Sequence, residues 1–248
     1  MTTVNVQDKK RNILKDFLEG SRLSIPIALG YFPVSFTFGL MAVRGGIPVW
    51  IVILISMTNI TSAGQFAGTN LIIAGAGLTE IAVTTFVINI RYMLMSLSLS
   101  QRLVAGVSSI KRLILAFVVT DETFTVAAMQ KRDISFSFMA GLELLPYIGW
   151  SAGTAVGAMV CTLLPQTLQD SMGIALYAMF IALVIPAAKK SRAALVVAGC
   201  AIIISTVIKW IPVFPFISGG WRIIIATAIA CTLGAKMFPP QDAETDRE

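Results

Sequence analysis

The sequence predicts an all-α polytopic membrane protein, a bundle of about seven or eight transmembrane or re-entrant helical segments. Of its 248 residues, 56% are apolar and only 13% are charged, and the mean hydropathy is +0.82. A soluble domain carries about 25% charged residues, so this chain has too few charges to coat itself in water. Residues 23–43, 45–79, 144–169 and 171–188 contain no Asp, Glu, Lys or Arg. Each run has about the 18 residues or more that a helix needs to cross hydrocarbon, whereas a signal peptide would explain only one run near the N-terminus.

The N-terminal stretch, residues 1–22, is polar and rich in Lys and Arg, so we expect a cytoplasmic tail or an interfacial helix with the N-terminus inside. Residues 23–238 are expected to form one transmembrane domain, and the acidic tail at 239–248 to be disordered. The candidate membrane segments are 23–43, 48–74, 79–100, 113–130, 136–164, 172–188, 193–211 and 220–238.

Basic residues in the loops leave two topologies open. Eight simple crossings place the basic clusters at 131–132 and 189–192 inside, but the cluster at 102–112 outside, against the preference for basic cytoplasmic loops. If segments 48–74 and 113–130 are broken and re-entrant, each entering and leaving on one face, all three clusters lie inside.

The same two segments carry polar runs at membrane depth, TNITSAGQ at 58–65 and TDET at 120–123. Non-helical backbone is tolerated there only beside protein or a water-filled cavity. The first run indicates either close helix packing through small residues, or a broken helix whose free N–H groups receive a substrate carboxylate. Its substrate-binding candidates are Asn59, Ser62, Gly64 and Gln65.

Glycine and proline recur at the starts of two segments. Gly20 and Pro26 open the first, and Gly141 and Pro146 open the fifth, about 120 residues later. A two-fold repeat, common in transporters, would produce this spacing, and so would chance among 19 glycines and 10 prolines. Other residues indicate that the first segment is bent or closely packed: Gly30, Pro33, Gly39, Gly45 and Gly46.

Arg91 lies in the middle of the third segment, where an ionisable group is costly unless it faces a cavity or a partner. One interpretation is an internal salt bridge to Asp121, Glu122 or Glu143 that locks the bundle. The other is recognition of a carboxylate, because the planar guanidinium offers two parallel donors. Nearby Asn89 joins Arg91 among the substrate-binding candidates.

Three acids at membrane depth are candidates for proton coupling: Asp121, Glu122 and Glu143. Asp121 and Glu122 point to different faces of any helix, so at most one is expected to face a given site, and we favour Asp121. Either could bind a substrate ammonium or carry a proton, because burial favours the protonated form of a carboxylic acid. With no histidine in the chain, these acids are the main proton carriers available. The alternative is a cap on a helix break, in which Asp or Thr accepts from free backbone N–H groups.

Composition and motifs also argue against other classes of function. Lys and Arg sit in short clusters between apolar runs, so the net charge of +6 does not indicate nucleic-acid binding. Cys161, Cys200 and Cys231 lie in apolar segments without metal-type spacing, and we expect free thiols and no metal. A Walker loop, an HExxH motif and a CxxC pair are all absent, so the sequence predicts neither an enzyme nor a cofactor.

Four runs form a set: PIALGYFPV at 26–34 with Phe38 and Gly39, SAGQF at 62–66, NIRYMLMS at 89–96, and TDETF at 120–124. In order and spacing they resemble the AzlC family of branched-chain amino acid exporters, over roughly residues 15–238. The resemblance implies efflux of leucine, isoleucine and valine by a large subunit that works with a small membrane partner of the AzlD type. It also implies energy from an ion gradient rather than from ATP.

Many members of this family have histidine after the arginine, where this chain has Tyr92, so that histidine cannot be a proton carrier here. We expect a multi-pass protein of a prokaryotic cytoplasmic membrane. The alternative function is a channel or scaffold subunit whose partner carries out translocation.

Overall fold

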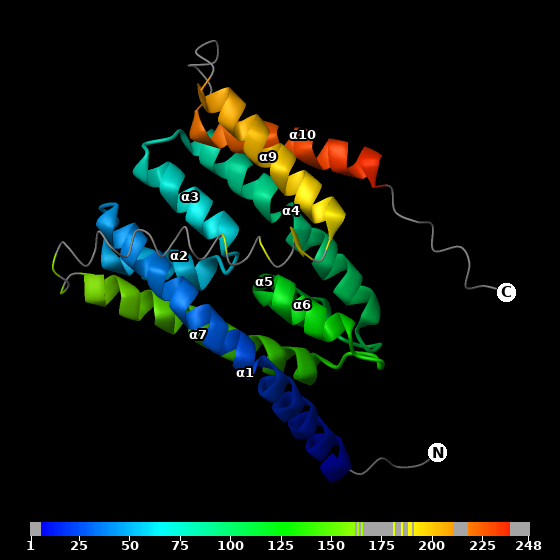
Figure 1. Cartoon of the computed structure of the whole chain (residues 1–248). Helices are drawn as coiled ribbons and strands as arrows, with labels where there is room; N and C mark the ends of the chain where they lie inside the picture. Colours follow the sequence, from blue (N-terminus) through cyan, green and yellow to red (C-terminus); the bar gives the residue numbers. More distant parts are fainter. Residues whose placement is uncertain are drawn as a thin grey trace.

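The computed structural model describes residues 6–161, 191–210 and 218–238, with single positions at 163, 165, 181, 185, 188 and 189. Side chains are described from residue 13 onward. In this part of the chain the regular structure is helical, apart from an isolated β-bridge between Leu103 and Ile134 (Figure 1). The helices are α1 (Val6–Arg44), α2 (Val49–Thr58), α3 (Ala63–Ile73), α4 (Leu78–Arg102), α5 (Ser109–Val118), α6 (Asp121–Ala128), α7 (Phe136–Cys161), α9 (Arg192–Trp210) and α10 (Gly219–Met237).

Within the described residues, five helical spans are long and apolar enough to cross a membrane, which confirms the all-α polytopic prediction. They are Ile13–Arg44, Leu78–Arg102, Phe136–Cys161, Arg192–Trp210 and Gly219–Met237. Helix α1 passes without interruption through residue 22, so the boundary expected there marks a change of composition within one helix. The predicted segment at 172–188, apart from three single positions, and the tail at 239–248 lie outside the described residues.

Helices α1 and α7 pack side by side and run in the same direction (Figure 1). At their crossing Gly20 of α1 lies opposite Gly141 of α7. Gly20 lies against Phe138 and Leu142, three residues before and one residue after Gly141, and Gly141 lies against Phe17 and Ser21, at the same offsets from Gly20. A two-fold repeat would give a crossing of this form. Because glycine has no side chain, the two backbones approach each other closely, which is the usual role of small residues between membrane helices.

The two polar segments are both broken into short helices. Between α2 and α3 the backbone leaves the helix at residues 59–62, and Ser62 has φ 46°, a left-handed conformation that is strained for a residue other than glycine. Between α5 and α6 it leaves the helix at Val119 and Thr120. Thr120 and Thr123 cap α6 reciprocally, each side chain accepting from the backbone N–H of the other.

Both broken segments turn back on themselves. Gly45, just after α1, lies against the Ile73 side chain at the end of α3, so α2–α3 begins and ends at one end of the bundle. Arg112 in the first turn of α5 donates to the Ser100 carbonyl oxygen (2.9 Å), and Arg102 donates to that of Ala128 at the end of α6 (2.6 Å). The α5–α6 segment therefore begins and ends at the other end, beside the start of α7 (Figure 1).

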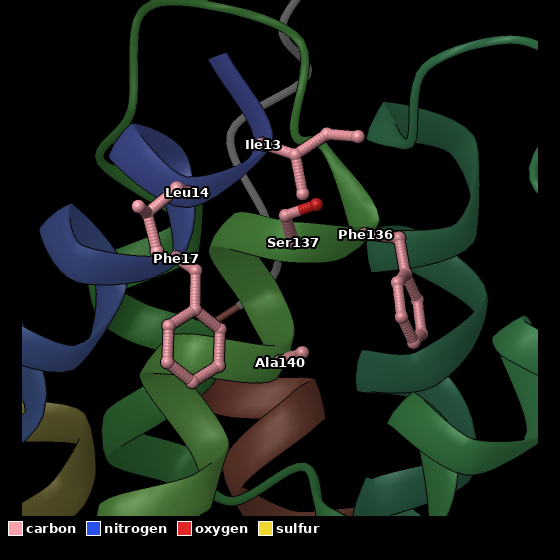
Figure 2. Close-up of a pocket in the computed structure, with 6 residues that line it drawn as sticks. All are labelled: Ile13, Leu14, Phe17, Phe136, Ser137 and Ala140. Carbon is pink, nitrogen blue, oxygen red and sulfur yellow. The ribbon is translucent and has the colours of Figure 1, made fainter. Parts of the chain in front are cut away.

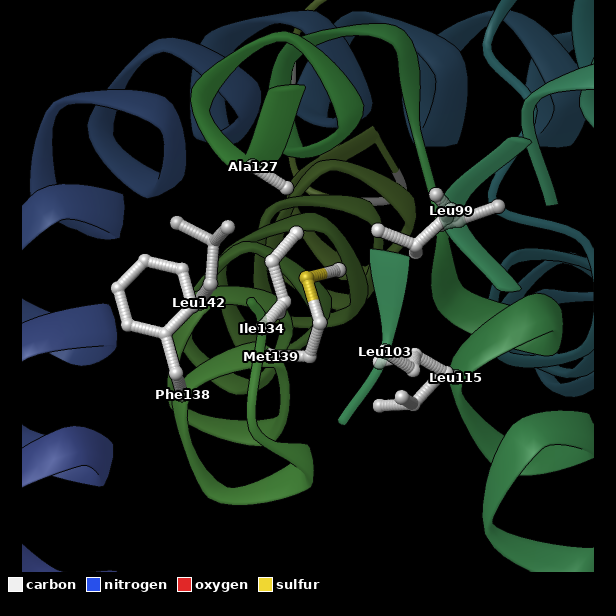
Figure 3. Packing of buried hydrophobic residues seen from close by; sticks show 9 residues of the cluster. Leu99, Leu103, Leu115, Ala127, Ile134, Phe138, Met139 and Leu142 are labelled. Carbon is white, nitrogen blue, oxygen red and sulfur yellow. The ribbon is translucent and has the colours of Figure 1, made fainter. Parts of the chain in front are cut away.

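The α5–α6 segment is held by a buried apolar cluster beneath it (Figure 3). Leu99 from α4, Leu115 from α5, Ala127 from α6, and Met139 and Leu142 from α7 meet in this cluster. Lipid tails are as apolar as these side chains, so the cluster packs the α5–α6 segment against α4 and α7 through van der Waals contacts.

Helices α9 and α10 form a pair that is attached to α4. Gly234 in α10 lies against the Val197 side chain of α9. The Glu80 carboxylate, in the first turn of α4, accepts from the Gly220 amide N–H (2.7 Å) and from the Ser218 hydroxyl. Glu80 thus caps the first turn of α10, where a negative charge is favourable.

Candidate functional site

The breaks in the two interrupted segments, α2–α3 and α5–α6, converge on the middle of α4. Tyr92 in α4 donates its hydroxyl to the Thr61 carbonyl oxygen in the first break (3.2 Å). Its neighbour Arg91 reaches Asp121, the first residue of α6 after the second break. Helices α3 and α6 both begin at these breaks, so the N-termini of two helices, which favour anions, lie within reach of consecutive residues of α4.

Arg91 and Asp121 form an ion pair, with 2.5 Å between Nη1 and Oδ2. The pair is the internal salt bridge considered from the sequence, with Asp121 as the partner. Both side chains remain open, 44% exposed for Arg91 and 42% for Asp121. An ion pair facing hydrocarbon would be costly, so its open face requires water, a ligand or another protein.

Tyr92 holds the guanidinium from the other side. Arg91 Nη2 lies 3.2 Å from the Tyr92 hydroxyl, and the guanidinium carbon lies 4.9 Å from the ring centroid. A cation over an aromatic face gains about 0.5–2 kcal/mol. Arg91 is therefore held by two groups, and its planar fork is oriented before any ligand arrives.

A second chain of contacts joins the two breaks through α1 and α7. The Tyr31 hydroxyl of α1 donates to the Glu122 carboxylate of α6, and the Tyr31 ring packs edge-on against Trp150 of α7, with 5.3 Å between centroids. Trp150 Nε1 donates to Gln65 Oε1 in α3 (3.0 Å). Asp121 and Glu122 thus leave α6 in different directions, each with its own partner.

The sequence did not single out Tyr31 or Trp150, because aromatic residues in apolar segments are typical of lipid-facing or core positions. Only the position of Tyr31 inside the run at 26–34 could have drawn attention to it. Trp150 had no such signal.

The remaining site candidates surround the first break. Gly64 lies against the Asn89 side chain, so any side chain at position 64 would displace Asn89. Asn59 accepts from the Thr61 hydroxyl (2.7 Å). Gln65 is 1% exposed. Two buried atoms, Gln65 Nε2 and Asn89 Oδ1, have no hydrogen-bond partner among the described residues. Unsatisfied buried polar atoms at a helix break are unusual and suit a site whose ligand completes them.

Glu143 is placed apart from this network. It lies in α7, is 3% exposed, and its Oε1 has no partner, whereas Asp121 and Glu122 are both engaged.

One pattern in α7 has the form of an enzymatic motif. The run GWSAG at 149–153 matches the GxSxG nucleophile elbow of hydrolases, which requires a sharp strand-to-helix turn. Here it lies inside α7, where Gly149 and Gly153 pack against α1, and the chain has no histidine to activate Ser151. Among the described residues no group of three His, Cys, Asp or Glu could hold a metal ion.

Comparison with known proteins decides the family. Residues 26–164, from within α1 to just past α7, match the family described as AzlC protein. The chain belongs to the AzlC family. These are multi-pass membrane proteins of transporter type, linked to branched-chain amino acid transport and pairing typically with AzlD, and the family indicates no enzymatic activity.

Relatives of this AzlC chain are also membrane proteins. The inner membrane protein YgaZ of Escherichia coli K12 is 30% identical over 190 residues, covering 74% of this chain and 78% of YgaZ. An uncharacterized membrane protein of Archaeoglobus fulgidus is also 30% identical, over 75% of this chain and 82% of its own length. An uncharacterized membrane protein of Helicobacter pylori J99 is 28% identical, over 60% of this chain and 66% of its own length. No solved structure matches.

Proposed function

We propose that this AzlC protein exports branched-chain amino acids across the cytoplasmic membrane of a prokaryote, driven by an ion gradient and together with a small AzlD-type subunit. The observation that carries the proposal is the half-exposed Arg91–Asp121 pair at the point where both re-entrant segments break. A binding site for a zwitterion needs one cation and one anion side by side. In a transporter this site must also lie at a depth in the membrane that the substrate can reach from either end of the bundle.

The chemistry of an amino acid matches this pair. The substrate carboxylate takes the place of Asp121 on the Arg91 fork, and the substrate ammonium binds the Asp121 carboxylate that is released. Each charge keeps an opposite partner, so no bare charge is left in the low dielectric. Asn59, Ser62, Gly64, Gln65 and Asn89 surround the carboxylate from the first break, and Glu122 lies beside Asp121 at the start of α6.

In this proposal residues 23–238 form the transport domain, and the polar stretch at 1–22, most of which is the first part of α1, lies on the cytoplasmic side. The proposal places the ends of α4, α6 and the start of α7 on the cytoplasmic side, because their loops carry the basic residues.

A transport assay tests the function. The full chain, alone and with its small partner, is reconstituted in liposomes, and we expect gradient-driven movement of labelled leucine and valine but not of labelled lysine. Lysine is the matched control, because it has the same backbone charges and a charged side chain. If neither binding nor movement of leucine occurs with or without the partner, the chain is not the translocating subunit, and the scaffold or channel function replaces the proposal.

Cysteine labelling tests the topology. In a variant without Cys161, Cys200 and Cys231, we expect Ser108→Cys, between α4 and α5, to react with an impermeant maleimide only from the cytoplasmic side. We expect Ala74→Cys, between α3 and α4, to react only from the outside. Both positions are exposed. Eight simple crossings would reverse both results, so each variant is the control for the other.

A further inference from the structure

We propose that Glu143, and not Asp121 or Glu122, is the residue that binds the coupling proton, in a cavity between α5 and α7 whose shape changes with the substrate site. The proposal rests on the proposed function, and it selects among three acids by their contacts. Asp121 is paired with Arg91, and Glu122 accepts from Tyr31. Glu143 has an unpartnered Oε1 and is 3% exposed.

Burial without a partner determines the chemistry of Glu143. An isolated carboxylate in a low-dielectric interior costs several kcal/mol, and the group takes a proton instead. An acid that is neutral when enclosed and loses its proton when water reaches it is a proton-binding site that movement can open and close. Asp121 differs from Glu143 because its carboxylate is half-exposed and already paired with Arg91.

Among the described residues, those that line the cavity around Glu143 carry no charge that would compete for it. The cavity has a volume of ≈ 310 Å³ and is lined, besides Glu143, by Ile114, Leu115, Phe117, Val118, Ala140, Leu144 and Tyr147. Tyr147 donates its hydroxyl to the Met57 carbonyl oxygen (3.2 Å). The two basic residues of α5 are held elsewhere, because Lys111 lies over the Phe136 ring and Arg112 donates to the carbonyl oxygens of Val107 and Ser100.

The two neighbours of α7 differ in how closely they pack. On the α1 side, glycines bring the backbones into contact, so a shift there would meet close-packed atoms. On the α5 side, Leu115 belongs to the same apolar cluster as Met139 and Leu142 of α7, and beside it the ≈ 310 Å³ cavity lies between the two helices at Glu143. Helix α5 can therefore move relative to α7 with a smaller loss of van der Waals attraction than α1 can, and such a movement would change the access of water to Glu143.

Helix α5 also connects the cavity around Glu143 to the proposed substrate site. Only Val119 and Thr120 separate α5 from α6, and α6 begins with Asp121. When a substrate separates Asp121 from Arg91, the first turn of α6 loses its ion pair with α4, while Arg102 still holds the last turn of α6. The adjoining end of α5 then shifts together with this first turn. In each cycle the Glu143 carboxylate takes up one proton on one side and releases it on the other, with no bond other than O–H made or broken.

A cavity of similar size lies near the starts of α1 and α7 (Figure 2). The described residues that line it are Ile13, Leu14, Phe17, Phe136, Ser137 and Ala140, and none of these titrates. Glu143 thus distinguishes the α5–α7 cavity from this one.

Infrared spectroscopy of the purified full chain tests proton binding without transport. We expect a carboxylic acid carbonyl band that is present in the wild type and absent in Glu143→Gln, which is neutral and of similar shape. Glu19→Gln is the matched control, because Glu19 is half-exposed and paired with Arg132, and it should leave the band unchanged. If the band does not depend on Glu143, the proton site is wrong, whatever the transport assay shows.

Transport in liposomes tests coupling. We expect Glu143→Gln to keep leucine counterflow without a pH gradient to within about twofold, and to lose pH-driven leucine movement by about tenfold or more. Movement driven by pH that equals that of the wild type would overturn the proposal, and so would loss of counterflow together with driven movement, because Glu143 would then serve the substrate itself. Absence of leucine counterflow in the wild type would instead reject the proposed function, and the infrared band would still decide the proton site.

Discussion

Replacing Arg91 with alanine should reduce the affinity for leucine by about 100-fold, and replacing it with lysine by about tenfold. A hydrogen bond to a charged group contributes about 1.5–3 kcal/mol, and alanine removes both the charge and the fork that holds the carboxylate. Lysine keeps the charge but not the bidentate geometry. Binding of labelled leucine to the purified chain measures both effects. Arg132 provides the control, because it is another paired arginine, bound to Asp16 and Glu19, and Arg132→Lys should leave leucine binding unchanged.

A charge swap separates the two interpretations of Arg91. The double variant Arg91→Asp with Asp121→Arg keeps an ion pair between α4 and α6. If the pair only locks the bundle, the swap should largely restore binding and transport. If Arg91 holds the substrate carboxylate, the swap should remain inactive, because cation and anion have exchanged places relative to the helix N-termini at the breaks. Recovery in the swapped variant would reject the substrate site proposed at this pair.

The sequence predicted the parts of the fold that depend on local composition. The apolar segments predicted four long helices, α4, α7, α9 and α10, to within about three residues at each end, and α4 occupies Leu78–Arg102 where 79–100 was expected. Polar runs inside apolar segments gave the two breaks, because a helix at membrane depth rarely carries so many hydrogen-bonding side chains in lipid. For the polar stretch at 1–22 the sequence left a tail or an interfacial helix open, and the start of α1 at Val6 was not predicted, since no change of hydropathy marks it.

The contacts of the site required the folded chain. The sequence offered three acids for Arg91, and only the turn of α5–α6 back towards α4 brings Asp121 to it. The cap on α6 comes from Thr120 and Thr123, while Asp121 faces Arg91, so the cap and the ion pair coexist. The glycines of the first segment likewise have different roles. Gly39 is closely packed, whereas Gly30 is not, a difference that residue type alone cannot express.

The same difference provides a matched test of the α1–α7 pair. Gly39→Ala should lower the free energy of unfolding by about 1–3 kcal/mol or more, because the added methyl group overpacks a helix crossing. A Cβ at position 39 would lie 2.7 Å from the Ala158 amide nitrogen and closer still to the Thr154 carbonyl oxygen. Backbone atoms cannot rotate away as a side chain can, so the two helices must separate.

Gly30→Ala in the same helix should have the opposite sign. A Cβ at position 30 meets no atom within 4 Å, so the substitution adds only the helix preference of alanine over glycine, about 0.5–1 kcal/mol of stability. Thermal unfolding of both variants in detergent measures the difference. Since α7 also carries Trp150 and Glu143, separating α1 from α7 should disturb the Tyr31–Trp150 contact and weaken leucine binding in Gly39→Ala but not in Gly30→Ala. Equal stabilities for the two variants would mean that α1 and α7 do not cross at Gly39, and the rigid pair against which α5 is proposed to move would have no basis.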